Sequence, residues 1–446
     1  MEEENILEIR FKRTARIFCI VCIILFGIGL ANYSLNEDSR VRDYTGIQNV
    51  INGDAAGYYV YLPAFFIYHF SPERFPDKTP EHGGNGFHYE NNKVHSKYTF
   101  GLAMAYSPFF LGAHCIAKDK SGYSRDYHRA VRLAAVFYCT LGLLFCFLFF
   151  SIYVNQFVAL ILLIPLFCGT SLMYSTLKIP AFSHIISFCL ITGFVYCVAI
   201  FKRNPRHWCK WCLPFLFGFI MSVRIINGIV ILLIPFWDYT NLKDLLTYSK
   251  KLFKDYKFII AFICCVLLFQ TPQFLYNIYL HGTIWSEPYP GEHFTNIAHP
   301  RLKVVLFGAE NGLYIYTPLF LLFTICNLYS LQEKFRNGLL ILFFFFTIGL
   351  IYASWYTPTM GICCFSHRVF TDYIGLFAFP FVWTMDSLLK NKKYIVIIIT
   401  GIVVYLFCSL TLHIYAFYWY CYYGKGYWDY FWLINDYFNF HHLKSQ

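Results

Sequence analysis

Long apolar runs, separated by short basic or polar segments, form the main pattern along the 446-residue chain. A helix that crosses the hydrocarbon core of a bilayer needs about 20 apolar residues, and several of these runs reach that length. The pattern therefore predicts an all-α polytopic membrane protein. The expected simple spans lie near residues 14–33, 130–152, 156–175, 182–201, 258–278, 314–330, 337–354, 369–388 and 395–418.

The basic residues gather in the connections between these runs, and their placement predicts the orientation of the chain. Five clusters stand out, at the N-terminus and at residues 202–210, 243–257, 333–336 and 390–393. Because the cytoplasmic loops of membrane proteins are enriched in Lys and Arg, we expect all five clusters in the cytoplasm. The N-terminus is then cytoplasmic and the C-terminus periplasmic.

Two apolar segments fit this orientation only if neither is a simple span. Residues 100–117 would reverse every later loop if they crossed the membrane, so we expect a juxtamembrane helix on the outer face. The block 212–237 has basic clusters on both sides. We therefore expect it to enter and return as two short helices, with a turn near residues 223–228. The total is then about eleven transmembrane helices.

This topology turns residues 34–129 into a long first outer loop. The loop is expected to carry two interfacial helices, at residues 57–70 and 100–117, with a polar segment between them. Residues 419–446 form an outer aromatic tail. The whole chain, residues 1–446, is expected to be a single membrane-embedded domain.

Composition supports the membrane assignment and argues against a nucleic-acid partner. The chain is 58% hydrophobic and 14% charged, whereas a soluble domain averages about 25% charged residues. The formal net charge is +11, but the basic residues form topology signals between apolar runs rather than one binding surface. The sequence contains no P-loop, dinucleotide-binding glycine motif or HExxH motif, so no bound nucleotide is predicted.

Asp54, in the stretch GDAAGYY, is the first candidate for chemistry. It stands just before an aromatic run that includes the candidate cavity residues Tyr58 and Tyr59. A carboxylate near the bilayer surface, walled by aromatic rings, can accept a proton from an alcohol as a general base. The alternative is a structural role as the N-cap of the following helix, a position that Asp favours.

Three basic residues are candidates for binding a phosphate group on the same outer face. Lys97 stands where the first outer loop returns to the interface, and Arg368 offers a forked donor suited to phosphate. Arg224 lies inside an apolar block, where a charge costs about 2.5–3.5 kcal/mol, so it must face a polar cavity or a partner. Headgroup contact, a structural salt bridge and positional anchoring remain the respective alternatives for Lys97, Arg224 and Arg368.

His184, Glu310 and His367 are further candidates for lining an outer cavity. Each stands near the predicted outer end of a span, and Glu310 is a candidate second acid. For His184 the alternative is an ordinary helix-end histidine, and for His367 it is a role in anchoring the loop. These residues predict no metal site by spacing.

Four stretches of the sequence resemble the GT-C superfamily of polytopic glycosyltransferases. They are GDAAGYYVYLPAFF in the first outer loop, KYTFGLAMAYSPFF after it, GFIMSVRIING in the middle of the chain, and SWYTPTMGICCFSHRVFTDY in a late outer loop. The resemblance covers most of the chain in order, although each motif is short. It is strongest to bacterial members without a large outer domain, such as protein O-mannosyltransferase-like and aminoarabinose-transferase-like proteins.

The resemblance implies an enzyme that takes a sugar from a polyprenyl-phosphate-linked donor at the outer membrane face. Asp54 would be the catalytic base, and Lys97, Arg224 and Arg368 would hold the donor phosphate. Members that use a divalent metal often carry a second acid close to the first, whereas Asp54 is followed by two alanines. That departure puts a metal cofactor in doubt, with Glu310 as the available distant ligand.

The function predicted from these observations is inverting glycosyl transfer at the periplasmic face of a bacterial inner membrane. The acceptor would be a hydroxyl on a glycan, a lipid or a protein, and the sequence leaves the choice among them open. One alternative is an enzyme like an O-antigen polymerase or ligase, which also uses lipid-linked glycans. The other is a lipid-linked glycan transporter or flippase, which would place its polar groups near the middle of the membrane.

Overall fold

A computed structural model of the chain describes residues 2–40, 50–76, 79, 86–205, 208–239, 241–286, 291–332, 337–359 and 365–417. The chain that the sequence treats as one domain divides into two compact units. We call residues Met1–Phe145 with Ser175–Gly291 unit 1, and Cys146–Tyr174 with Glu292–Gln446 unit 2. The predicted outer tail, residues 419–446, and the basic cluster 333–336 lie outside the described residues.

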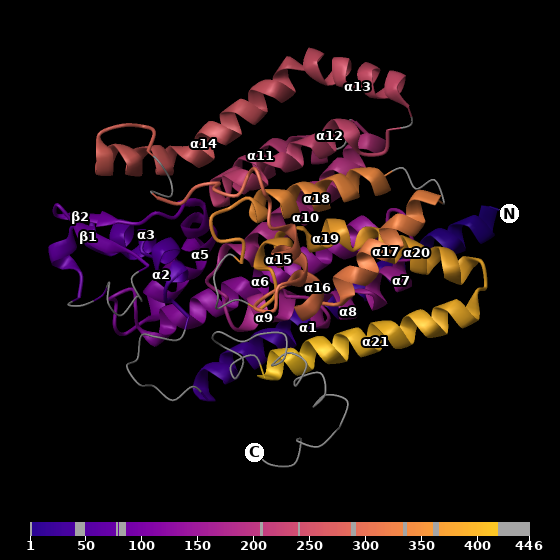
Figure 1. Ribbon diagram of the computed structural model, residues 1–446, viewed down its shortest axis with the longest axis horizontal. Coiled ribbons are helices and arrows are strands. Elements are labelled where there is room, and N and C mark those ends of the chain that lie inside the picture. Colours follow the sequence, from indigo (N-terminus) through magenta and orange to yellow (C-terminus); the bar gives the residue numbers. More distant parts are fainter. Residues whose placement is uncertain are drawn as a thin grey trace. The chain divides into compact units, whose positions relative to one another are not determined.

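The described chain is mostly helical, and its long apolar helices are those of a membrane protein (Figure 1). Five helical segments are long and apolar enough to cross a bilayer, which confirms an all-α membrane protein. They coincide with five of the predicted spans, while the count of eleven crossings stays a prediction. The helices are α1 (Glu2–Arg40), α6 (Arg125–Phe150), α10 (Ser183–Arg203), α14 (Tyr256–His281) and α21 (Tyr394–Phe417).

Three of the remaining predicted spans are interrupted rather than continuous. The break before α17 shows the cause, because Thr317 precedes Pro318 and has an extended backbone (φ −135°, ψ 71°). A residue before proline is disfavoured in the α conformation. The pieces are α7 (Gln156–Ile161), α8 (Leu163–Cys168) and α9 (Leu172–Leu177); α16 (Leu313–Tyr316) and α17 (Leu319–Gln332); and η4 (Arg368–Tyr373), α19 (Ile374–Phe377) and α20 (Phe379–Lys390).

The other predicted span of unit 2, residues 337–354, is the uninterrupted helix α18 (Gly338–Ala353), which has 16 residues. It packs against α17 and against the short helix α15 (Leu302–Phe307). Phenylalanine side chains fill the interior of the unit, and Phe320, Phe344 and Phe370 are fully buried. The core of unit 2 is therefore rich in aromatic rings, although it also buries polar side chains such as Asn327 and Asp386.

The block 212–237 folds back on itself at the predicted turn, while its entry into the membrane stays a prediction. Helix α11 (Cys209–Val223) ends at Arg224, whose extended backbone precedes the 3₁₀ segment η3 (Ile225–Leu232) and α12 (Leu233–Phe236). Arg224 contacts His184 at the start of α10, whereas the carbonyl of Pro235 accepts a hydrogen bond from Lys202 at the end of α10. The turn therefore lies at the start of α10, and the far end of the returning arm lies at the end of α10.

Helix α14 runs alongside α11 in the same direction. Lys210, at the start of α11, forms an ion pair of 2.5 Å with Asp255, at the start of α14. Helix α13 (Leu242–Lys254) precedes α14, and none of its residues is buried, although Leu242 and Phe253 are apolar. A basic helix with exposed apolar side chains is typical of a segment that lies in the membrane interface.

Residues 34–129, which the sequence predicts as the first outer loop and which keep that name below, are more structured than expected where the structure describes them. The helix expected at residues 57–70 begins earlier, as α2 (Asp54–Tyr59), and continues through α3 (Tyr61–Pro63) and the π-helical turn η1 (Ala64–Tyr68). It ends where His69 and Phe70 adopt left-handed backbone angles. The polar segment holds the short 3₁₀ turn η2 (Pro72–Arg74) and the strands β1 (His88–Glu90) and β2 (Lys93–His95).

The second predicted interfacial helix is α5 (Gly101–Ile116), with Pro108 in its interior. Its 16 residues span about 24 Å at 1.5 Å per residue, which is short for a crossing. It packs against α2, α3, α10, α11 and α14. Figure 1 shows α2, α3, α5 and the two strands gathered at one end of unit 1, with α13 at the other end.

Candidate functional site

Asp54 is held by a tyrosine that comes from the far end of the first outer loop. It is the first residue of α2, and it follows Gly53, whose φ of 55° turns the chain sharply into the helix. The hydroxyl of Tyr98 donates a hydrogen bond of 2.5 Å to Oδ1 of Asp54. The carboxylate is half-buried rather than turned fully to solvent. Asp54 is therefore the first helical residue rather than the N-cap that the structural alternative required, because Gly53 occupies the cap position and no side chain caps the helix. Its carboxylate is oriented by Tyr98 instead.

Lys97 stands beside this hydrogen bond. Its ammonium lies 5.6 Å from the centre of the Tyr98 ring, and the side chain is exposed. The other face of the site is aromatic, because the rings of Tyr58 and Tyr98 lie 4.5 Å apart. The acid and one predicted phosphate ligand thus flank the same tyrosine ring.

The segment from Ser96 to Phe100 is fixed along its length. The Ser96 hydroxyl donates to the carbonyl of Gly57 at 2.7 Å, which ties the segment to α2. The Thr99 hydroxyl donates to the carbonyl of Val223 at 2.7 Å, and the Phe100 amide donates to Gln273 of α14 at 2.9 Å. One short stretch of chain therefore connects the acid to the tip of the α11 turn.

Arg224 occupies that tip. Its Nη1 donates to Nδ1 of His184 at 3.2 Å, so Nδ1 of the imidazole accepts in this contact. His184 is 3% exposed, and Arg224 is half-buried. Since Thr99 binds the residue directly before Arg224, the structure brings His184 and Arg224 to the same end of unit 1 as Asp54 and Lys97.

Two glycines allow this close packing. A Cβ on Gly57 would lie 2.2 Å from a ring carbon of Tyr98 and 2.3 Å from the carbonyl oxygen of Gly86. A Cβ on Gly101 would lie 2.2 Å from the backbone of Ser222. Any side chain at these two positions would push α2 and α5 away from their partners.

Tyr59 serves packing rather than the surface of the site. Its hydroxyl donates to the carbonyl of Gly122 at 2.5 Å, and the side chain is 1% exposed. Burial raises the pKa of Tyr59 well above its usual value, with the neighbouring Tyr123 adding to the effect. The ring fixes the position of α2 against the later part of the outer loop.

A second cluster of chemical groups lies on the β1–β2 hairpin, which sequence reasoning missed. His88, Glu90 and His95 place one potential metal-ligand atom each within 4.8 Å of one another. The pattern H-x-E-x₄-H around an Asn-Asn turn was the available signal, because it puts all three side chains on one face of a hairpin. Partial burial and the nearby His88 lower the pKa of His95.

The other three candidates belong to unit 2. His367 is fully buried, and its Nε2 lies 2.8 Å from the carbonyl of Pro358, so it holds the loop before η4. Arg368 begins η4 and is half-buried, whereas Asp372 in the same turn is 1% exposed. Glu310 is exposed, just after α15. His367 therefore acts as a structural residue, and Arg368 keeps a partly accessible position.

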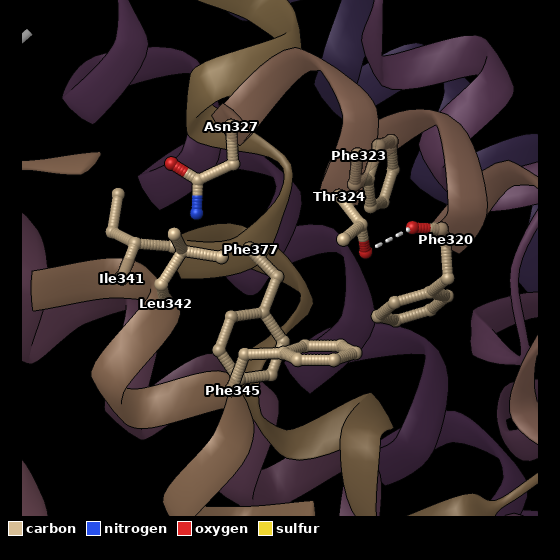
Figure 2. Close-up of a pocket in the computed structure, with 8 residues that line it drawn as sticks. All are labelled: Phe320, Phe323, Thr324, Asn327, Ile341, Leu342, Phe345 and Phe377. Carbon is tan, nitrogen blue, oxygen red and sulfur yellow. Dashed lines mark hydrogen bonds between the residues drawn. The ribbon is translucent and has the colours of Figure 1, made fainter. Parts of the chain in front are cut away.

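Unit 2 also contains a small, mainly apolar recess. Figure 2 shows its walls of phenylalanine and aliphatic side chains from α17, α18 and α19, with Asn327 and Thr324 as the polar members. The Thr324 hydroxyl donates to the carbonyl of Phe320 at 2.9 Å within its own helix. None of the residues that line this recess is ionisable, so it offers an apolar ligand no acid, base or charge.

Comparison with protein-family models finds no match for this chain, and comparison with curated proteins finds none either. The interpretation of the site accordingly depends on its own geometry and on the chemistry of its residues.

Proposed function

We propose that this protein transfers a sugar from a polyprenyl-phosphate-linked donor to an acceptor hydroxyl, with inversion and with Asp54 as the general base. The observation that carries the proposal is the hydrogen bond from Tyr98 to Asp54, which orients the acid beside Lys97. The reaction needs a base for the acceptor hydroxyl and a cation for the leaving phosphate. The carboxylate of Asp54 and the ammonium of Lys97, both close to Tyr98, are groups of these two kinds.

Each residue then has a defined task. Asp54 accepts the proton of the acceptor hydroxyl while the hydroxyl oxygen forms a bond to the anomeric carbon. The bond between that carbon and the phosphate oxygen breaks from the opposite face, and the lipid phosphate leaves with the electron pair. Lys97 stabilises the charge on the departing phosphate, with Arg224 in support, whereas a phosphate contact by Arg368, which belongs to unit 2, stays a prediction from the sequence. Preoriented cations of this kind contribute several kcal/mol in a site that excludes water.

The distribution of charge within unit 1 supports a periplasmic position for the site. Lys202, Lys210 and the lysines of α13 lie at the end of unit 1 opposite Asp54 and Arg224. Because Lys-rich segments stay in the cytoplasm, the acid would face the periplasm. We place the protein in a bacterial inner membrane, with a lipid-linked donor arriving from the outer leaflet and a glycan, lipid or protein as acceptor.

The position of Arg224 favours transfer over transport. A transporter collects polar groups near the middle of the membrane, usually at interrupted helices. Arg224 does stand at a helix interruption, but it contacts His184 in the first turn of α10, a helix of 21 residues. Arg224 and His184 therefore lie at one end of α10 rather than at its middle. A polymerase or ligase of lipid-linked glycans would differ from the proposed enzyme in the number of sugars moved.

The test uses purified full-length protein in lipid nanodiscs with a radiolabelled pool of polyprenyl-phosphate sugars and a membrane extract as acceptor. Wild-type protein should consume the donor and label the acceptor, and Asp54→Asn should slow transfer by about 10²–10⁴-fold. Asp119→Asn is the matched control. Asp119 is another acid of the first outer loop, and its carboxylate accepts a local hydrogen bond from the amide of Ser121.

Transfer by Asp54→Asn at the wild-type rate would overturn the assignment of the base. Wild-type protein that consumes no lipid-linked sugar would overturn the enzymatic proposal as a whole. The length of the labelled product distinguishes a single transfer from polymerisation.

A further inference from the structure

The β1–β2 hairpin presents three potential metal ligands on one face. Its antiparallel register places His88 opposite His95 and Glu90 opposite Lys93. Alternate residues of a strand share a face, and directly opposed residues lie on the same face, so His88, Glu90 and His95 point to one side. The two imidazole rings stack with their centres 5.2 Å apart, and Nε2 of His88 lies 3.6 Å from Oε2 of Glu90.

We propose that this hairpin binds a divalent transition-metal ion, with Zn²⁺ as the best fit, through His88, Glu90 and His95. Two imidazoles and one carboxylate form a ligand set that suits zinc, with water in the fourth position. Calcium and magnesium are disfavoured because they prefer sets made of oxygen atoms alone. Ligand atoms around a tetrahedral zinc ion lie about 3.4 Å apart, so separations within 4.8 Å need only small side-chain rotations.

The state of His95 prepares it as a ligand. Its Nε2 is buried and has no hydrogen-bond partner in the part of the chain that the structure describes. A buried, unpaired imidazole nitrogen costs free energy, and a metal bond would satisfy it.

The hairpin is also held in place from behind. The Tyr279 hydroxyl accepts from the amide of Val94 at 3.2 Å, and the Tyr276 hydroxyl donates to the Val94 carbonyl at 2.9 Å. Lys93 lies opposite Glu90 and so shares the face of the three ligands, but its ammonium donates to the carbonyl of Leu280 at 3.0 Å, which ties its charge to α14. These contacts fix β2 before any ion arrives, so little ordering is required for binding.

The position of the hairpin gives the ion a structural role. Strand β2 ends at His95, and Ser96, Lys97 and Tyr98 follow directly. An ion bound to both strands would therefore clamp the start of the segment that orients Asp54. Asp54 is not a member of this ligand cluster, so the ion would act on the site only through the position of that segment.

The experiment measures zinc binding by full-length protein that carries no histidine tag. Protein stripped with a chelator is titrated with Zn²⁺ in competition with a chromophoric chelator, and Co²⁺ absorption then reports the coordination geometry. We expect one zinc ion that is lost in His88→Ala and His95→Ala, each with at least about 100-fold weaker binding, beyond the range for groups that only support a ligand. His299→Ala is the matched control, because His299 is exposed and belongs to unit 2.

Equal zinc binding by wild type, His88→Ala and His95→Ala overturns the proposal, as does wild-type protein that binds no zinc. Any zinc held by the cysteines is common to all variants, so it cancels when the zinc bound by a variant is subtracted from the zinc bound by wild type. His88 is exposed, so its replacement leaves the fold intact, and Glu90→Gln offers a second, isosteric ligand variant. The titration contains no donor or acceptor, so its result is independent of whether the protein transfers a sugar.

Discussion

The hydroxyl of Tyr98 donates to Oδ1 of Asp54 across 2.5 Å, and the two residues are 44 positions apart in the chain. This hydrogen bond gives the acid a fixed orientation beside Lys97, and it depends on the outer loop folding back over α2. The catalytic role proposed for Asp54 therefore extends to Tyr98 as a positioning residue.

Replacing Tyr98 by Phe should lower kcat/KM by about 10–100-fold, because a hydrogen bond to a charged group contributes about 1.5–3 kcal/mol. The ring and its packing against Tyr58 remain in this variant. Initial rates with the radiolabelled donor measure the effect, together with a pH profile, which a purely structural role would leave unshifted.

Tyr68→Phe is the control for Tyr98→Phe. It likewise removes one tyrosine hydroxyl from the first outer loop, but the hydroxyl of Tyr68 donates to the backbone carbonyl of Ser121 and not to a carboxylate. It should retain transfer close to wild type. A Tyr98→Phe protein with an unchanged rate and an unchanged pH profile would show that the Asp54 contact has no part in the reaction.

Gly57→Ala should disrupt the site through packing alone. The added Cβ would meet the Tyr98 ring at 2.2 Å, and overpacking of this kind costs about 1–3 kcal/mol. We expect a lower melting temperature and a loss of activity at least as large as that of Tyr98→Phe, measured by intrinsic tryptophan fluorescence and by transfer assays.

Gly112→Ala is the matched comparison for Gly57→Ala. Gly112 lies in helix α5 with no atom within 4 Å of its added Cβ. Alanine there should stabilise the helix by up to about 1 kcal/mol or leave it unchanged. If both alanine variants melted and reacted alike, the close contact at Gly57 would not be important for the site.

Arg224→Gln should reduce kcat by about 10²–10³-fold if Arg224 stabilises the departing phosphate, since this is the usual cost of removing one preoriented donor. Competition with a short-chain polyprenyl phosphate should show weaker binding to the variant. Arg203→Gln, at the opposite end of α10, should bind and react as wild type does. Equal inhibition of all three proteins would remove Arg224 from the phosphate site.

Asp255→Asn should change the pH dependence of stability. The hydrogen bond with Lys210 is the main cause that lowers the pKa of Asp255 below its usual value of 3.8. Because the folded pKa is depressed, the ion pair stabilises the protein above about pH 4, and this contribution is lost as pH falls through the folded value. The carboxylate is 35% exposed, so we expect no more than about 1 kcal/mol after solvent screening.

Asn is also a good N-cap residue, so Asp255→Asn isolates the ion pair from the cap of α14. Melting curves at pH 7 and at pH 3 provide the measurement. The difference between wild type and variant should be present at pH 7 and should shrink at pH 3; a difference that grew at pH 3 would contradict this sign.

The predicted orientation can be tested with epitope tags inserted in unit 1. A tag at Asn92, in the exposed turn of the β1–β2 hairpin, should bind antibody on intact spheroplasts of a bacterial host. A tag before Asn241, at the start of α13, should bind only after lysis. The reverse pattern would place Asp54 in the cytoplasm and overturn the periplasmic site.

Hydropathy and charge were sufficient to predict much of the architecture. The five long helices follow from uninterrupted apolar runs, and the turn at Arg224 follows from basic clusters on both sides of one apolar block. Both are local properties of the chain, because the cost of burying charge or unpaired backbone in lipid applies wherever a segment lies. The interruption at Pro318 was also visible in the sequence, but one proline changes the mean hydropathy of a long apolar run little, so the span that contains it was predicted as continuous.

The partners within the site were decided by tertiary structure alone. Asp54, Lys97, His184 and Arg224 could each be selected from the sequence as polar residues in apolar surroundings, but nothing in their spacing pointed to Tyr98 as the partner of Asp54 or to the direct contact between His184 and Arg224. A hydrogen bond or a metal-ligand set requires atoms to meet within a few ångströms, and that separation depends on how the outer loop folds rather than on the types of residue it contains. The sequence by itself thus determined which segments are apolar enough to enter the membrane. Only the fold decided which side chains meet at the ends of those segments.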